Sequence, residues 1–116
     1  MGIEAFSEDG QFTPDRIARV LRTTKEEVAR TVGLGRDAVM RPERIASVRT
    51  QSRLREMIEI LNRVEPRFGS ALVAYAWYRS EPLAGFDGMT PMQLVREGRA
   101  GEVMEYIDAV EAGVHA

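Results

Sequence analysis

Residues 74–116, AYAWYRSEPLAGFDGMTPMQLVREGRAGEVMEYIDAVEAGVHA, organise the fold of this chain. An apolar segment ends at Trp77 and Tyr78, and a loop rich in glycine and proline follows it. Thr90 can accept a hydrogen bond from a free N–H of a first helical turn, and Pro91 has no N–H that would be left unpaired there. Gln93 stands three residues after Thr90, which is the spacing of a capping box. The sequence therefore predicts a helix that begins at Thr90.

Two glycines divide the rest of this stretch. Gly98 stands where the end of a helix needs a residue that tolerates a positive φ. After it, Val103, Ile107 and Val110 are spaced by four and three residues, so they share one face of a second helix. Gly113 is predicted to end this second helix as Gly98 ends the first.

The order of these residues resembles that of a known family. The pieces that carry the resemblance are Trp77, Pro82 and Leu83, Thr90 and Pro91, Leu94 and Val95, Gly98, Val103, Ile107, and the closing Glu111, Ala112, Gly113 and Val114. This ordered set resembles the C-terminal, toxin-binding domain of Xre/MbcA/ParS-type antitoxins, which pair with RES-domain toxins. The resemblance is close over the last part of the chain and loose elsewhere. It implies an all-helical antitoxin whose C-terminal region blocks the NAD⁺ site of a toxin that consumes or transfers ADP-ribose from NAD⁺.

The resemblance also implies which residues bind the toxin. They are Leu94, Val95, Gly98, Val110, Gly113, Val114, His115 and Ala116. In this interpretation Gly113 turns the chain, and residues 114–116 project from the body with the terminal carboxylate free to pair with a basic group. From the residues alone, a frayed tail is the alternative.

Charge is distributed unevenly along the chain, although the net charge is only −2. Residues 13–55 hold 11 basic and 5 acidic residues, whereas residues 64–116 hold 4 basic and 8 acidic ones. A basic front half suits nucleic acid, and an acidic back half suits a basic protein partner. A solvated surface with internal ion pairs is the alternative interpretation.

The front half resembles a helix-turn-helix. Thr13 followed by Pro14 predicts one helix start, and Thr24 with Glu27 predicts a second capping box. Ala29 supplies a small residue where two helices cross, and Gly33 supplies the turn. The antitoxin family carries an Xre-like domain of this kind here, and its members commonly regulate their own operon.

The expected third helix covers residues 36–41 and is cut off by Pro42. It contains no Asn or Gln, the usual readers of adenine. DNA binding is therefore expected to be weak, or to need a complex, and to rest on phosphate contacts by Arg36, Arg41 and Arg44.

The longest predicted helix covers residues 52–64 and presents a wide apolar face made by Leu54, Met57, Ile58, Leu61 and Val64. Pro66, Phe68 and Gly69 are predicted to break it. Ser70 then caps a helix in which Val73, Ala76 and Trp77 share a face, with Trp77 as a packing anchor of the core.

No strand-like alternation is visible, so the predicted fold class is all-α. The expected organisation is a flexible arm over residues 1–12, with Phe6 and Phe12 tucked against the body. A helix-turn-helix-like domain with a connecting helix then covers residues 13–64, and a toxin-binding domain covers residues 65–116.

An enzyme is not expected. The one histidine is His115 beside the C-terminus, and there is no cysteine and no nucleophile motif. Residues 33–38 fit the G-x-G-x-x-A pattern but follow a helical segment rather than a strand, which argues against nucleotide binding. No metal and no cofactor are expected.

The chain is expected to act in the cytoplasm, since it lacks cysteine and a signal peptide, and its longest apolar run, residues 71–78, is too short to cross a membrane. The leading hypothesis is an antitoxin that forms a homodimer or a hetero-oligomer with a RES-domain toxin. A DNA-binding regulator without a toxin and a structural or polar-localisation partner are the alternatives.

Overall fold

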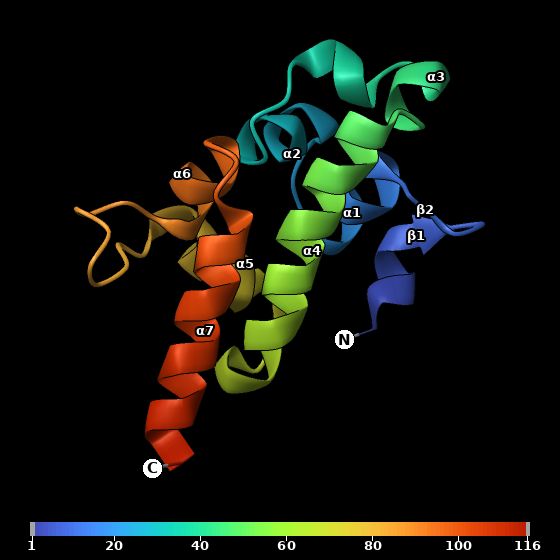
Figure 1. Ribbon diagram of the computed structural model, residues 1–116. Helices are drawn as coiled ribbons and strands as arrows, with labels where there is room; N and C mark the ends of the chain where they lie inside the picture. The colour runs from blue at the N-terminus through green and yellow to red at the C-terminus, as the bar shows by residue number, and fades with distance from the viewer. Residues whose placement is uncertain (1, 116) are drawn as a thin grey trace.

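The computed structural model describes residues 2–115, and helices dominate it, which confirms the predicted all-α class (Figure 1). Within these residues the chain forms two 3-10 helices, one small hairpin and seven α-helices. In order they are η1 (Ile3–Phe6), β1 (Ser7–Glu8), β2 (Gln11–Phe12), α1 (Pro14–Val20), α2 (Lys25–Thr31), η2 (Arg36–Val39), α3 (Pro42–Ile45), α4 (Val48–Phe68), α5 (Ala71–Ser80), α6 (Pro91–Arg96) and α7 (Ala100–His115).

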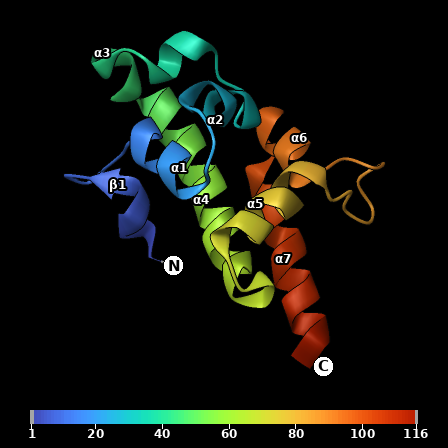
Figure 2. The same cartoon turned by 180° about the vertical axis from the view of Figure 1, so that it is seen from behind.

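Helix α4 is the spine of the molecule. In Figures 1 and 2 it runs through the middle, with the hairpin and α1 along one side, α5, α6 and α7 along the other, and α2 next to α6. The Ser47 side chain accepts a hydrogen bond from the Thr50 N–H at 3.2 Å, and Gly69, with φ at +82°, ends the helix. The helix is thus longer than predicted, and the predicted break at Pro66 is wrong. Pro66 stands in the last turn, where its fixed φ suits a helix and only one hydrogen bond is lost.

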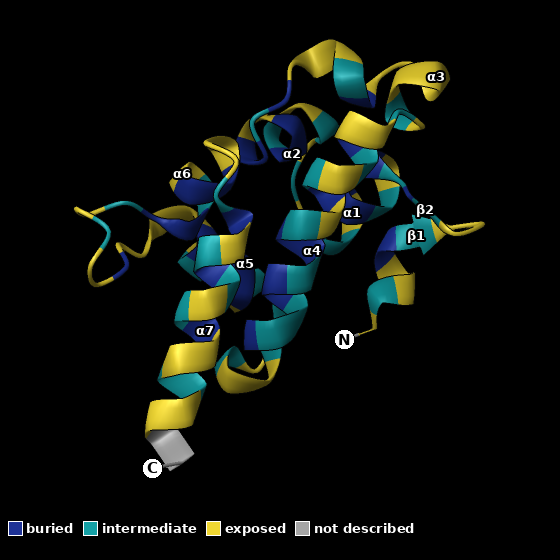
Figure 3. Cartoon of the chain, in the orientation of Figure 1, coloured by how far each residue is buried: buried dark blue, intermediate teal, exposed yellow. Residues whose placement is uncertain are grey.

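One continuous hydrophobic core joins both ends of the chain, from Phe6 to Ile107. As expected, Phe6 and Phe12 are buried. The hairpin between them was not predicted, although its turn is Asp9-Gly10, a pair that favours a tight hairpin because both residues adopt a positive φ here. Figure 3 shows that the buried residues gather along the helix faces that meet α4.

Helix α5 turns a different face inward from the one predicted. Ala74, Tyr75 and Tyr78 are buried, whereas Ala76 is exposed and Val73 is 49% exposed. The prediction that Val73, Ala76 and Trp77 form the inner face is therefore wrong. The helix is apolar on both faces, so periodicity alone could not identify the inner one.

The capping box at Thr90 is confirmed. The Thr90 N–H donates to the Gln93 side chain at 2.9 Å, and the Gln93 N–H donates to the Thr90 hydroxyl at 3.1 Å. Gly98 follows α6 with φ at +79°, as predicted. Gly113 does not end α7, so that prediction is wrong: the helix continues to His115, and Gly113 is not among the glycines with positive φ. A glycine inside a helix costs only about 1 kcal/mol, so it permits a helix end but does not impose one.

The front half follows its predicted helix starts but not its third helix. Gly33 makes the turn after α2 with φ at +77°, and Ala29 is buried. Instead of one helix over residues 36–41, the chain forms the 3-10 turn η2 and then α3, because Pro42 suits the first turn of a new helix. Only half of the capping box at Thr24 forms: its hydroxyl accepts from the Glu27 N–H, but the Glu27 carboxylate binds Arg30. In residues 2–115 we find no helix with the length and apolarity needed to span a bilayer.

Candidate functional site

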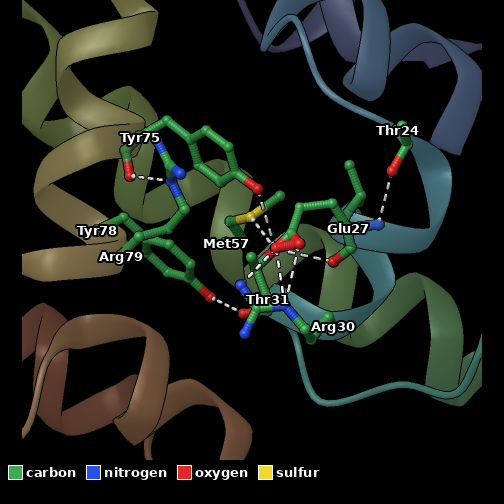
Figure 4. A network of polar contacts seen from close by, with 9 residues as sticks. Thr24, Glu27, Arg30, Thr31, Met57, Tyr75, Tyr78 and Arg79 are labelled. Carbon is green, nitrogen blue, oxygen red and sulfur yellow. Dashed lines mark hydrogen bonds and ion pairs between the residues drawn. The ribbon is translucent and has the colours of Figure 1, made fainter.

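The joint between α2 and α5 fixes the position of the C-terminal helices. Figure 4 shows the Tyr78 hydroxyl donating to the Thr31 carbonyl at 2.7 Å, and the Tyr75 hydroxyl donating to the Thr31 hydroxyl at 3.4 Å. The Arg79 guanidinium lies 4.3 Å from the centre of the Tyr75 ring. Burial raises the pKa of Tyr78 well above its ordinary value, so the phenol keeps the proton that it donates. These contacts hold α5 on the front half of the molecule.

Three of the expected toxin-binding residues lie around the end of α6. Leu94 and Val95 are fully buried in the core, so their side chains offer no contact surface to a partner. The Arg53 guanidinium donates to the Val95 carbonyl and ties the end of α6 to α4. Gly98 is exposed in the turn that follows. Leu94 and Val95 therefore pack α6 into the core and do not contribute to the molecular surface.

The second half of α7 is held by one arginine. Arg63 on α4 donates to Asp108 at 2.6 Å and to Glu111 at 2.9 Å, and these hydrogen bonds raise the pKa of Arg63. Val110 is half-buried beside them, and Gly113 is exposed. The end of α7 extends past the other helices in Figure 1. Of the remaining expected residues, Ala116 and the side chains of Val114 and His115 lie outside the described residues.

A groove, here called the α5 groove, lies between the end of α4, α5 and the second half of α7. It encloses about 70 Å³. The residues that line it are Arg63, Val64, Arg67, Phe68, Trp77, Tyr106, Ile107, Val110 and Glu111. Trp77 is half-buried here, with its ring centre 5.8 Å from that of Phe68, so it packs at the edge of the core rather than as its anchor. The sequence held no signal for a role of Arg67, and Phe68 was predicted only as part of the break after the long helix.

The loop over residues 81–89 is fastened to α7 by aromatic and charged contacts. Phe86 meets Tyr106 edge to face, with ring centres 6.2 Å apart. Arg99 lies over the Phe86 ring and donates to Glu102 at 2.8 Å, which lowers the pKa of that carboxyl. The loop therefore has a defined position.

The arginines that were expected to bind DNA lie in the segment just before α4, at the end of that helix opposite to the α5 groove. Arg36, Arg41 and Arg44 are all exposed. Arg36 lies 3.7 Å from Glu26, whereas Arg41 and Arg44 form no ion pair within residues 2–115. A hollow of about 410 Å³ beside Arg44 is also lined by Arg49 and Ser47, which sequence analysis did not single out. The described part of the chain holds no group of three or more His, Cys, Asp or Glu that could bind a metal ion.

Comparison with known proteins finds a family model that matches the C-terminal part of the chain. Residues 63–113 match the model of the antitoxin Xre/MbcA/ParS C-terminal toxin-binding domain. This match confirms the resemblance found in the sequence and supports the role of an antitoxin. No curated protein and no solved structure matches the chain. The matched segment contains α5, α6, the α5 groove and α7 as far as Gly113, but not α2.

Proposed function

We propose that this protein is the antitoxin of a type II toxin-antitoxin system and that it neutralises a RES-domain, NAD-consuming toxin by covering its active site. The match of residues 63–113 to a toxin-binding domain carries the proposal. It is supported by the extension of α7 past the other helices, which leaves its end accessible to a partner (Figure 1).

In this proposal residues 113–116 enter the NAD⁺ cleft of the toxin. The buried Leu94 and Val95 hold α6 at the start of α7, and the half-buried Val110 lies in the last part of α7, nearer to the entering end. A small end suits such a cleft because it excludes the larger cofactor.

The test is co-expression of a RES-domain toxin with the full chain or with a chain that lacks residues 113–116. We expect the full chain to restore growth and to co-purify with the toxin. The deletion should leave the melting temperature nearly unchanged, because Gly113 contributes no side chain to the core, but it should weaken neutralisation. A shortened chain that neutralises fully would show that the toxin-binding surface lies elsewhere on the C-terminal helices.

A second function, binding of operator DNA, is favoured by the exposed arginines at the start of α4. We infer that Arg36, Arg41 and Arg44 contact phosphates and that the protein thereby regulates its own operon, alone or in complex with the toxin. A regulator without a toxin is the alternative. Gel shifts on the protein's own promoter over a salt series should show affinity that falls steeply with salt.

The triple substitution Arg36→Ala, Arg41→Ala and Arg44→Ala should weaken this binding and reduce its salt dependence. A control with Arg19→Ala, Arg22→Ala and Arg67→Ala removes the same charge from other exposed positions. Equal operator binding by both triple variants would refute the assignment. Light scattering with and without toxin would show whether the protein is a homodimer or a hetero-oligomer in the cytoplasmic complex that we propose.

A further inference from the structure

Helix α5 is apolar on two sides, and one of them is covered by the residues that the structure describes while the other is largely not. Its inner face, with Tyr75 and Tyr78, packs in the core. Its outer side carries Val73, Ala76 and Trp77, of which Val73 is 49% exposed. A helix that is apolar all round is typically buried all round. The outer side is therefore the best candidate in the molecule for a surface that a partner covers.

The α5 groove lies next to this surface and shares Trp77 with it. Val64 and Ile107, both nearly fully buried, form its floor, and Phe68, Trp77 and Val110 are half-buried around it. Its volume of about 70 Å³ is well below the roughly 150 Å³ of a cavity that holds benzene. The groove therefore fits an aliphatic side chain rather than an aromatic ring.

The charges at the rim of the groove determine which group of the partner can lie next to the bound aliphatic side chain. Arg63 is compensated by Asp108 and Glu111 through the hydrogen bonds given above. Arg67 is exposed and forms no ion pair with any residue that the structure describes. Among the residues that the structure describes, Arg67 is therefore a positive charge at the edge of the groove without an ion-pair partner, which suits a carboxylate on the toxin.

Every residue that lines the groove lies within residues 63–113, the segment that matches a toxin-binding domain. We propose that the α5 groove anchors the toxin by taking one aliphatic side chain that stands beside a carboxylate on the toxin surface. This anchor rests on the proposed function and adds a second contact to the one made by residues 113–116. A second copy of this chain fits less well, because a two-fold pairing centred on the groove would bring the two Arg67 side chains toward each other.

The experiment measures binding of the full chain to a purified RES-domain toxin by calorimetry. Val110→Trp places beside the groove a ring that is too large to enter it, which should block the partner's side chain, and we expect at least tenfold weaker binding. Arg67→Glu reverses the charge at the rim and should weaken binding about tenfold, with a smaller loss at high salt. Arg67→Lys keeps the charge and should stay within about threefold of the wild type. Arg19→Glu makes the same reversal on α1, and no change is expected from it.

Each outcome decides one question. Binding of Val110→Trp as tight as wild type, or equal effects of Arg67→Glu and Arg19→Glu, would overturn the anchor and leave the antitoxin assignment intact. A wild-type chain that fails to bind the toxin would overturn the proposed function and the anchor with it. If Val110→Trp dissociates a homodimer while toxin binding is unchanged, the groove is a self-association surface and the anchor is wrong. If Val110→Trp lowers the melting temperature strongly, the comparison of Arg67→Glu with Arg67→Lys decides instead, because Arg67 is exposed and its substitution should not disturb the fold.

Discussion

The two parts of this molecule on either side of Ser47 are specified in different ways. In residues 48–115, three helices begin after a Ser or Thr whose hydroxyl accepts a hydrogen bond from the backbone three residues on, namely Ser47, Ser70 and Thr90. In residues 2–47, Thr24 alone does so, and α1 and α3 begin with a proline instead. The C-terminal helices thus have strong local start signals, whereas the N-terminal elements are short and depend on contacts with α4.

The contrast does not make the two parts independent. Thr31 of the N-terminal part holds Tyr78, and Gln51 of α4 binds both the N–H and the carbonyl of Phe12 at 2.9 Å. The family match begins at residue 63, inside α4, whereas the core continues through it. The start of the family match therefore does not coincide with a boundary of the hydrophobic core, and experiments can test whether the two parts fold independently.

The largest effect is expected from cutting the chain at the family boundary. A fragment of residues 63–116 loses Leu54, Met57 and Ile58, which are fully buried in the continuous core. We expect it to show little helix by circular dichroism and no cooperative melting, whereas the full chain melts cooperatively. A fragment of residues 46–116, which keeps all of α4, is the matched control and should be more helical. Cooperative unfolding of the shorter fragment would make the family segment a folding unit of its own.

Two neighbouring aromatic residues test the orientation of α5. Tyr78 is fully buried and Trp77 is half-buried, so Tyr78→Ala should cost about 3–5 kcal/mol and Trp77→Ala clearly less, about 1–2 kcal/mol. Urea unfolding of both variants provides the comparison. A reversed order would mean that the outer side of α5 is the one that packs.

The attachment of the N-terminal hairpin to α4 is expected to be weaker. Gln51→Ala removes hydrogen bonds to Phe12 and to the Ile45 carbonyl, which should cost about 1–2 kcal/mol. Hydrogen exchange should report faster exchange at the Phe12 N–H than at buried amides of α5. Ser52→Ala, on an exposed position of the same helix, serves as the control. Equal protection in Gln51→Ala and Ser52→Ala would show that packing of Phe12 alone holds the hairpin.

The smallest effect concerns a surface ion pair on α2. The hydrogen bond from Arg30 lowers the pKa of Glu27 below its ordinary value of 4.5. This pair therefore stabilises the protein above pH 4.5, and the contribution is lost as the pH falls through the lowered pKa. Glu27→Gln should lower the free energy of unfolding by a few tenths of a kcal/mol at pH 7 and by less at pH 3. In contrast, Glu43→Gln, at an exposed position, should show no such difference between the two pH values.

The elements that the sequence predicted correctly are those with local signals. Thr90 and Gln93 predicted the start of α6 and Gly98 predicted its end, and the structure confirms both. The inner face of α5 and the continuation of α4 through Pro66 depend on what packs around them, which no local pattern contains. The Asp9-Gly10 turn did carry a signal, but the flanking strands are only two residues long and show no alternation.

The candidate site divides in the same way. The sequence pointed to Leu94, Val95 and Val110, and the first two lie in the core behind the surface. The α5 groove was missed because its wall combines Phe68, at the end of α4, with Val110 on α7, and their meeting follows from tertiary packing. The end of α7 was assigned from a glycine that the helix passes through.

The length of α4 also fixes a spacing. Its 21 residues rise about 31 Å, with the exposed arginines near its first turn and the α5 groove at its last. A ligand at one end cannot touch a ligand at the other unless it bridges that distance, so any communication between them has to travel as a tilt or rotation of the rod itself. Because the chain has no cysteine, a pair of introduced thiols at the two ends would carry fluorescent labels at defined positions and read out such a movement directly.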